Sequence, residues 1–153
     1  MRLRSIFLSI ALLYIIFLAA PAQAQVKPGV RAGAYFDSEA FFIGGEILTP
    51  VAESWYFNPN VEFAFGDNAD LVTFNFDFHY DFDTHSNYYI WIGGGPAIIH
   101  VDPDGRGPSD TDFGANIFMG VGFQTRGRLV PYIQPKIILA DNSEFALAFG
   151  LRF

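Results

Sequence analysis

The stretch VTFNFDFHYDF, residues 72–82, alternates large apolar and polar side chains without a break. One set comprises Val72, Phe74, Phe76, Phe78, Tyr80 and Phe82, and the other comprises Thr73, Asn75, Asp77, His79 and Asp81. Successive side chains of a β-strand point to opposite faces, so the stretch predicts a strand with one apolar and one polar face. An apolar face this large and uniform favours contact with lipid. Because period-two alternation does not tell which face is inside, a periplasmic sandwich with a phenylalanine-rich core stays open as the alternative.

The same alternation recurs along the chain and divides it into strand-length segments. We expect eight of them, at residues 30–36, 40–49, 55–66, 69–82, 88–102, 111–124, 130–140 and 144–153. In lipid every backbone N–H and C=O must be paired, which requires a closed sheet with no free edge. An even number of segments of about ten residues meets that requirement. The predicted fold is therefore all-β: an eight-stranded antiparallel up-and-down transmembrane β-barrel, apolar outside and polar inside.

The N-terminal segment has a different composition from the rest. Arg2 and Arg4 precede an apolar run at residues 5–20, and the small residues Ala22 and Ala24 follow it. This order is typical of a secretory signal peptide. The run is shorter than the roughly 20 apolar residues of a membrane-spanning helix. We therefore expect residues 1–24 to be a cleaved signal peptide and residues 25–153 to form one barrel domain.

Charge and composition exclude several kinds of partner and chemistry. The formal net charge of the full chain is −7, and removal of the two N-terminal arginines makes it more negative still. Nucleic acid is not expected as a partner of so acidic a protein. The chain has no cysteine, so disulfides and thiolate sites are excluded. No cofactor is expected.

The faces opposite the apolar rows carry polar residues that would lie inside the barrel. The expected lumen ion-pair network comprises Arg31, Glu46, Glu62, Asp77, His79, Lys136 and Arg152, joined by Asn58, Asn60, Asn75, Asn116 and Gln134. A barrel of about eight strands is just wide enough to be filled by side chains. Buried charges are tolerated when each has a partner, so these groups predict a plug. A proton path, a catalytic cluster and a narrow gated pore are the alternatives. For Arg152 the expected partner is Glu62 or Asp77.

The order of the connections suggests an orientation in the membrane. With the first strand running outward, the connections at 37–39, 66–69, 102–110 and 140–143 lie outside and both termini are periplasmic. Aromatic residues expected to form a girdle at the periplasmic interface are Trp55, Phe57, Tyr80, Phe82, Tyr89, Trp91 and Tyr132. The run Gly93–Pro96 indicates a bend or bulge, and the faces of the 88–102 segment stay unassigned.

Acidic residues gather on the outer connections. Among them, Asp102, Asp104, Asp110 and Asp112 carry the oxygen ligands that calcium takes, without the spacing of an EF-hand loop. They are candidate ligands only, and a solvated acidic loop is the alternative. Divalent cations are accordingly a candidate partner at this acidic rim, while no specific metal site is expected.

The last segment, EFALAFGLRF at residues 144–153, has apolar residues at alternate positions and ends in Phe. With the signal and the eight alternating segments, it resembles the closing strand of the small outer-membrane barrels similar to OmpX and the OmpA membrane domain. The resemblance implies a Gram-negative outer-membrane location, with outer-membrane lipid and the assembly machinery as partners. It also implies that the machinery reads Phe145, Leu147, Phe149, Leu151 and Phe153 as an assembly signal.

The family includes adhesive, lipid-modifying and structural members, so the resemblance leaves the role open. Some lipid A deacylases use a His-x-Ser pair, but here His85 and Ser86 are adjacent. We therefore expect a non-enzymatic barrel with a structural or envelope-interaction role. A lipid A-modifying hydrolase and a narrow gated pore are the alternatives.

Overall fold

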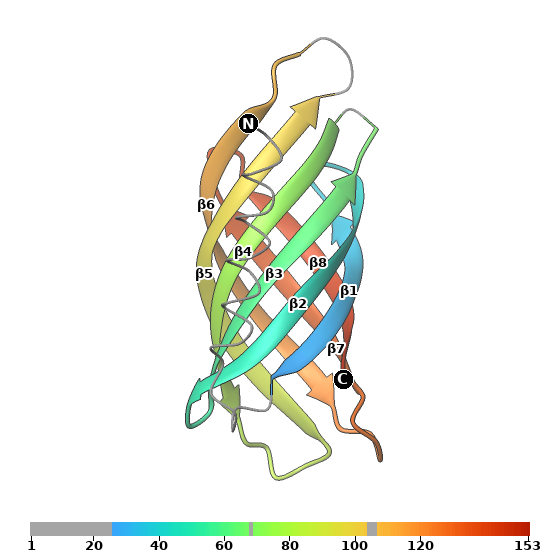
Figure 1. The fold of residues 1–153 in the computed structure, drawn as a ribbon, viewed down its shortest axis with the longest axis vertical. Coiled ribbons are helices and arrows are strands. Elements are labelled where there is room, and N and C mark those ends of the chain that lie inside the picture. The colour runs from blue at the N-terminus through green and yellow to red at the C-terminus, as the bar shows by residue number, and fades with distance from the viewer. Residues whose placement is uncertain (1–25, 68, 104–106) are drawn as a thin grey trace, which may run out of the picture.

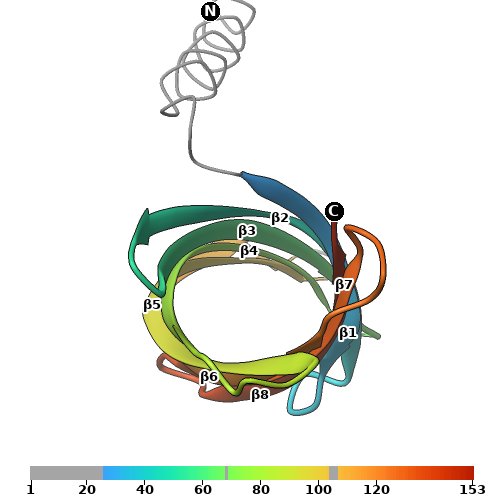
Figure 2. The same cartoon turned by 90° about the horizontal axis from the view of Figure 1, so that it is seen from below.

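The structure, a computed structural model, describes residues 26–67, 69–103 and 107–153. It contains eight strands: β1 (Lys27–Tyr35), β2 (Ala40–Ala52), β3 (Trp55–Phe65), β4 (Ala69–Phe82), β5 (Tyr88–Pro103), β6 (Asp110–Phe123), β7 (Val130–Leu139) and β8 (Glu144–Arg152). Each strand pairs antiparallel with the next, and β1 pairs with β8 to close the barrel. Figure 1 shows the tilt of the strands, and Figure 2 shows the closed ring. The predicted eight-stranded antiparallel barrel is confirmed.

The expected segment bounds agree with the strands to within a few residues. The largest differences are at β1 and β2, where β1 starts at Lys27 and β2 continues to Ala52. The expected signal peptide, residues 1–24, and Asp104 lie outside the described residues. Within the described residues, no helix is long and apolar enough to cross a membrane.

Large apolar side chains cover the outside of the barrel. In β4 the exposed residues are Phe74, Phe76, Phe78 and Phe82, while Thr73, Asn75, Asp77 and His79 are buried. The closing strand follows the same rule, because Phe145, Phe149 and Leu151 are exposed and Ala146, Ala148 and Arg152 are buried. The alternation in the sequence therefore matches the outer and inner faces of this sheet.

The glycine run of β5 contains no bulge, which was one of the two irregularities predicted for it. The register of β5 with β6 is continuous from Tyr88 to Val101. Gly93 and Gly95 face inward, where a Cβ atom would lie 2.2 Å from the Phe78 carbonyl oxygen and 2.1 Å from the Phe76 carbonyl oxygen. These glycines allow β5 to approach β4 closely without interrupting the strand.

Three members of the expected aromatic girdle lie in the lumen instead. Trp91 and Tyr132 are 0% and 3% exposed, and Tyr89 packs against them. Tyr132 shares its face of β7 with Gln134 and Lys136, which places it inside by the same alternation. Trp55 and Phe82 are exposed at the outside, where the Trp55 and Tyr80 rings lie 5.4 Å apart.

Three layers of buried side chains lie in the lumen. We call the end of the barrel that holds the start of β1 and the end of β8 the terminal end, and the opposite end the distal end. An apolar layer at the distal end comprises Tyr35, Ala40, Phe42, Ala64, Ile138, Ala146 and Ala148, with Leu71 and Ile99 against it. An aromatic layer toward the terminal end comprises Trp91, Phe118, Tyr132 and Tyr89. Between the two lies a buried polar network.

Candidate functional site

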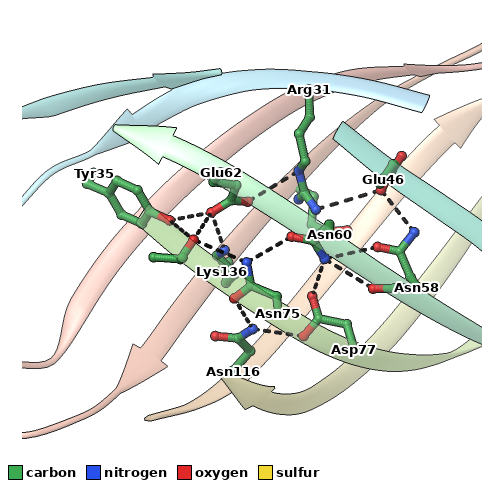
Figure 3. A network of polar contacts seen from close by, with 12 residues as sticks. Arg31, Tyr35, Glu46, Asn58, Asn60, Glu62, Asn75, Asp77, Asn116 and Lys136 are labelled. Atoms are coloured by element: carbon green, nitrogen blue, oxygen red, sulfur yellow. Dashed lines mark hydrogen bonds and ion pairs between the residues drawn. The ribbon is translucent and has the colours of Figure 1, made fainter. Parts of the chain in front are cut away.

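Glu62 of β3 is the most highly connected residue of the polar network (Figure 3). Lys136 Nζ donates a hydrogen bond to its Oε2 at 2.8 Å, and Thr73 Oγ1 donates to the same atom at 3.2 Å. The Tyr35 hydroxyl also donates to Oε2. Arg31 Nε lies 3.3 Å from Oε1. Glu62 is 0% exposed, so this carboxylate depends on protein groups in place of water.

Glu46 of β2 holds the second part of the network. Arg152 Nε donates to its Oε1 at 2.9 Å, and Asn58 Nδ2 donates to its Oε2 at 3.0 Å. Arg31 Nη1 lies 3.7 Å from the same carboxylate, so Arg31 makes ion-pair contacts with both glutamates.

The partner of Arg152 therefore differs from the two expected from the sequence. Gly29 of β1 is in register with Glu46 on one side and with Arg152 on the other. Glycine has no side chain, so the two long side chains meet across its position. A Cβ atom at Gly29 would lie 2.8 Å from Glu46 Oε1.

Asp77 of β4 is held by amides and not by cations. Asn60 Nδ2 donates to Oδ2 at 2.9 Å, and Asn116 Nδ2 donates to Oδ1 at 2.8 Å. Asn75 links the two amides, because it donates to Asn60 Oδ1 at 2.9 Å and accepts from Asn116 Nδ2 at 2.8 Å. Among the described residues, no Lys or Arg nitrogen lies within 4.0 Å of the Asp77 carboxylate.

His79 is buried beside the network without a hydrogen bond to it. Its Nε2 lies 3.2 Å from Asp81 Oδ1. Its ring packs 5.6 Å from the Trp91 ring and 5.5 Å from the Tyr56 ring.

The structure thus places all seven of the expected network residues in the lumen and brings six of them into one connected cluster.

Sequence reasoning missed the role of the aromatic layer. Arg152 lies 4.8 Å from the Trp91 ring and 4.5 Å from the Tyr132 ring, which are cation–π distances. Trp91 Nε1 also donates to Gln134 Oε1 at 3.0 Å. The Trp91 ring lies over Gly120, where a Cβ atom would be 2.2 Å from Trp91 Cε2. Inward glycines were a usable signal for these rings, because a Cβ atom at Gly150 would likewise lie 2.2 Å from Tyr132 Cζ.

The candidate metal ligands at the distal end do not converge. Asp102 is exposed on the outer face of β5, whereas Asp110 and Asp112 line an inner cavity, and Asp104 lies outside the described residues. The described part of the chain holds no group of three or more His, Asp or Glu residues arranged to bind a metal.

The side chains of His85 and Ser86 are not hydrogen-bonded to each other in the structure. His85 adopts a positive φ of 53° in the turn between β4 and β5. The Ser86 hydroxyl donates to the Thr84 carbonyl oxygen at 3.3 Å. A nucleophilic hydroxyl must lie within hydrogen-bond reach of its base, and this one is bonded to the turn backbone.

No family model and no curated protein matches the sequence. The fold is similar to that of the N-terminal β-barrel domain of Pseudomonas aeruginosa OprF, with a TM-score of 0.68 and 17% identity, covering 86% of this chain and 100% of that one. Neisserial surface protein A gives a TM-score of 0.61 and 14% identity, covering 84% and 94%. Yersinia pestis Ail, in complex with the heparin analogue sucrose octasulfate, gives a TM-score of 0.61 and 11% identity. The match covers 85% of this chain and 99% of that one. This chain therefore has the fold of the small eight-stranded outer-membrane β-barrels.

Proposed function

We propose that the chain is an integral outer-membrane protein of a Gram-negative-type bacterium with both termini in the periplasm. Its lumen is closed by side chains, and its role is structural or in envelope interactions, without catalysis. The support for membrane insertion is the exposed apolar surface, with Phe41, Ile43 and Phe113 between 60% and 76% exposed. A band of this kind is costly in water but is solvated by lipid chains.

The closing strand supports the proposed route into the membrane. Phe145, Phe149 and Leu151 face outward along β8, and Phe153 follows them at 48% exposed. In this proposal the assembly machinery binds these side chains, together with Leu147, before β8 pairs with β1 and closes the barrel. Outer-membrane lipid then covers the same side chains.

The packing of side chains across the barrel interior is the observation that supports the proposal of a closed lumen. The polar middle layer lies between an apolar layer and an aromatic layer. A water column would have to pass Phe42 and Ile138 at one end and Trp91 and Phe118 at the other, all 4% exposed or less. Ion pairs alone could separate to open a gate, but the apolar layers would still exclude water.

Planar-bilayer recordings test the closed lumen. The purified protein is expected to produce no single-channel steps, and Arg152→Ala is expected to produce none either, because both packed layers remain. Heat-modifiable migration on gels provides the control that each protein is folded. Resolved single-channel steps from the folded wild-type protein would contradict the closed lumen and favour a narrow pore.

The enzyme alternative has one geometric observation in its favour. His100 Nδ1 lies 2.9 Å from Thr111 Oγ1 on the outer face near the distal end. Among the described residues, however, no carboxylate lies within 4.0 Å of the His100 ring nitrogens to orient that ring. A hydroxyl needs a base that is itself held in place by a third group.

We therefore expect no deacylated product when the folded protein is incubated with labelled lipid A. Product formation by the wild-type protein that is lost in Thr111→Val would overturn the non-enzymatic proposal.

A further inference from the structure

The distal end of the barrel is uppermost in Figure 1. It contains a cavity of about 450 Å³. Its floor is the distal apolar layer, with Tyr35, Leu71, Ile99 and Ile138 among the lining residues. This volume is within the range of small-molecule binding sites, which are concave and largely apolar with a few polar groups at defined positions.

The wall of the cavity carries one sign of charge. Asp37, Glu39, Asp110, Asp112 and Glu144 line it, and none of the described lining residues is basic. Low-dielectric walls with charges of one sign concentrate counter-ions of the opposite sign. The cavity therefore combines an apolar base with a negatively charged entrance.

Two of these carboxylates already hold the barrel wall together. Glu144 Oε1 accepts a hydrogen bond from the Asp37 amide at 2.7 Å, and Asp37 Oδ2 accepts one from the Phe145 amide at 2.8 Å. Asp110 and Asp112 each accept a bond from the next backbone amide through Oδ1. An asparagine Oδ1 can accept the same two bonds, so Asp→Asn changes at these positions lose only the long bond, 3.4 Å, that Asp112 Oδ2 accepts from the Asp141 amide.

We propose that this cavity binds small organic cations that carry an apolar group, such as a primary amine attached to an aromatic ring. The ring lies on Leu71, Ile99 and Ile138, and the ammonium group is paired with the carboxylates of Asp110 and Asp112. Sulfated or phosphorylated anions are repelled by the same wall. This inference goes beyond the proposed function and does not depend on whether the lumen conducts.

The test is a titration of the methyl-labelled, folded barrel in zwitterionic lipid nanodiscs with phenethylamine, followed by NMR. We expect saturable shifts of the Leu71, Ile99 and Ile138 methyl signals, and weaker binding at higher salt. Ethylamine lacks the ring, whereas 2-phenylethanol lacks the charge, and both are expected to bind at least about tenfold more weakly. Equal binding of 2-phenylethanol would overturn the proposal, because partitioning of the ring into lipid would then account for the shifts.

A pair of variants separates the cavity charges from the overall charge of the distal end. Asp110→Asn with Asp112→Asn is expected to weaken phenethylamine binding by about fivefold to tenfold. Asp67→Asn with Asp141→Asn removes the same charge at the same end from residues that do not line the cavity, and is expected to leave binding within about twofold. Equal affinities of the two double variants, or the absence of saturable methyl shifts in the wild-type protein, would refute the site.

Discussion

Replacing Glu62 by glutamine is expected to lower the free energy of unfolding by about 3–5 kcal/mol. The change keeps the size of the side chain but removes the charge that Lys136 and Arg31 share at 2.8 and 3.3 Å. Lys136 is 1% exposed, and Glu62 is the only carboxylate among the described residues within 4.0 Å of it. The loss therefore leaves a buried ammonium without its counter-charge. Urea unfolding in lipid vesicles, followed by tryptophan fluorescence, measures the change.

Two further variants show whether the effect comes from the unpaired cation. Glu53→Gln removes an exposed carboxylate from the turn between β2 and β3 and is expected to change stability by less than about 0.5 kcal/mol. Glu62→Gln combined with Lys136→Met removes both partners and is expected to recover much of the loss. Lys136→Met is also measured alone. If the double variant loses as much stability as Glu62→Gln and Lys136→Met lose in sum, the ion pair is not the cause.

Trp91→Ala is expected to cost about 3–5 kcal/mol, with a broader unfolding transition as the aromatic layer loosens. The indole is 0% exposed, lies 5.6 Å from the Tyr132 ring, and donates its N–H to Gln134. Its removal leaves a cavity and also takes away one of the two rings that contact the Arg152 guanidinium. Denaturant titration monitored by circular dichroism measures the loss independently of the missing fluorophore. A cost below about 1 kcal/mol would show that the aromatic layer contributes little to the core.

A glycine pair provides a matched test of the same contact. Gly120→Ala places a methyl group 2.2 Å from Trp91 Cε2, whereas Gly45→Ala places one at the outside, with its nearest neighbour 4.0 Å away. Gly120→Ala is expected to destabilise by about 1–3 kcal/mol and Gly45→Ala not to destabilise. The Gly120→Ala penalty is expected to shrink in the Trp91→Ala background, because the clash is with the indole. An undiminished penalty there would place the clash elsewhere.

The number of strands, their antiparallel direction and, for most strands, the face to which each side chain points could be predicted from the sequence. These features depend on local properties. Alternation in the stretch at residues 72–82 follows directly from the pleat of a strand, which turns every second side chain to the same face. Closure follows from the requirement that every backbone polar group be paired in lipid. These arguments do not depend on which residues of neighbouring strands are paired. They failed at β5, where Gly93 to Gly95 give no side chains from which to infer the facing.

The contacts inside the lumen could not be predicted because they depend on the register between strands. The β8–β1–β2 register places Arg152 and Glu46 on either side of Gly29, and the β5–β6 register places Trp91 opposite Gly120. Residues that lie far apart in the sequence become neighbours only after the ring of strands has closed, and a different register would pair the same inward charges differently. The sequence by itself therefore determined which residues face the lumen in most strands, with β5 as the exception. Only the tertiary structure decided which of them meet, because the period of two belongs to a single strand whereas register is a property of the closed sheet.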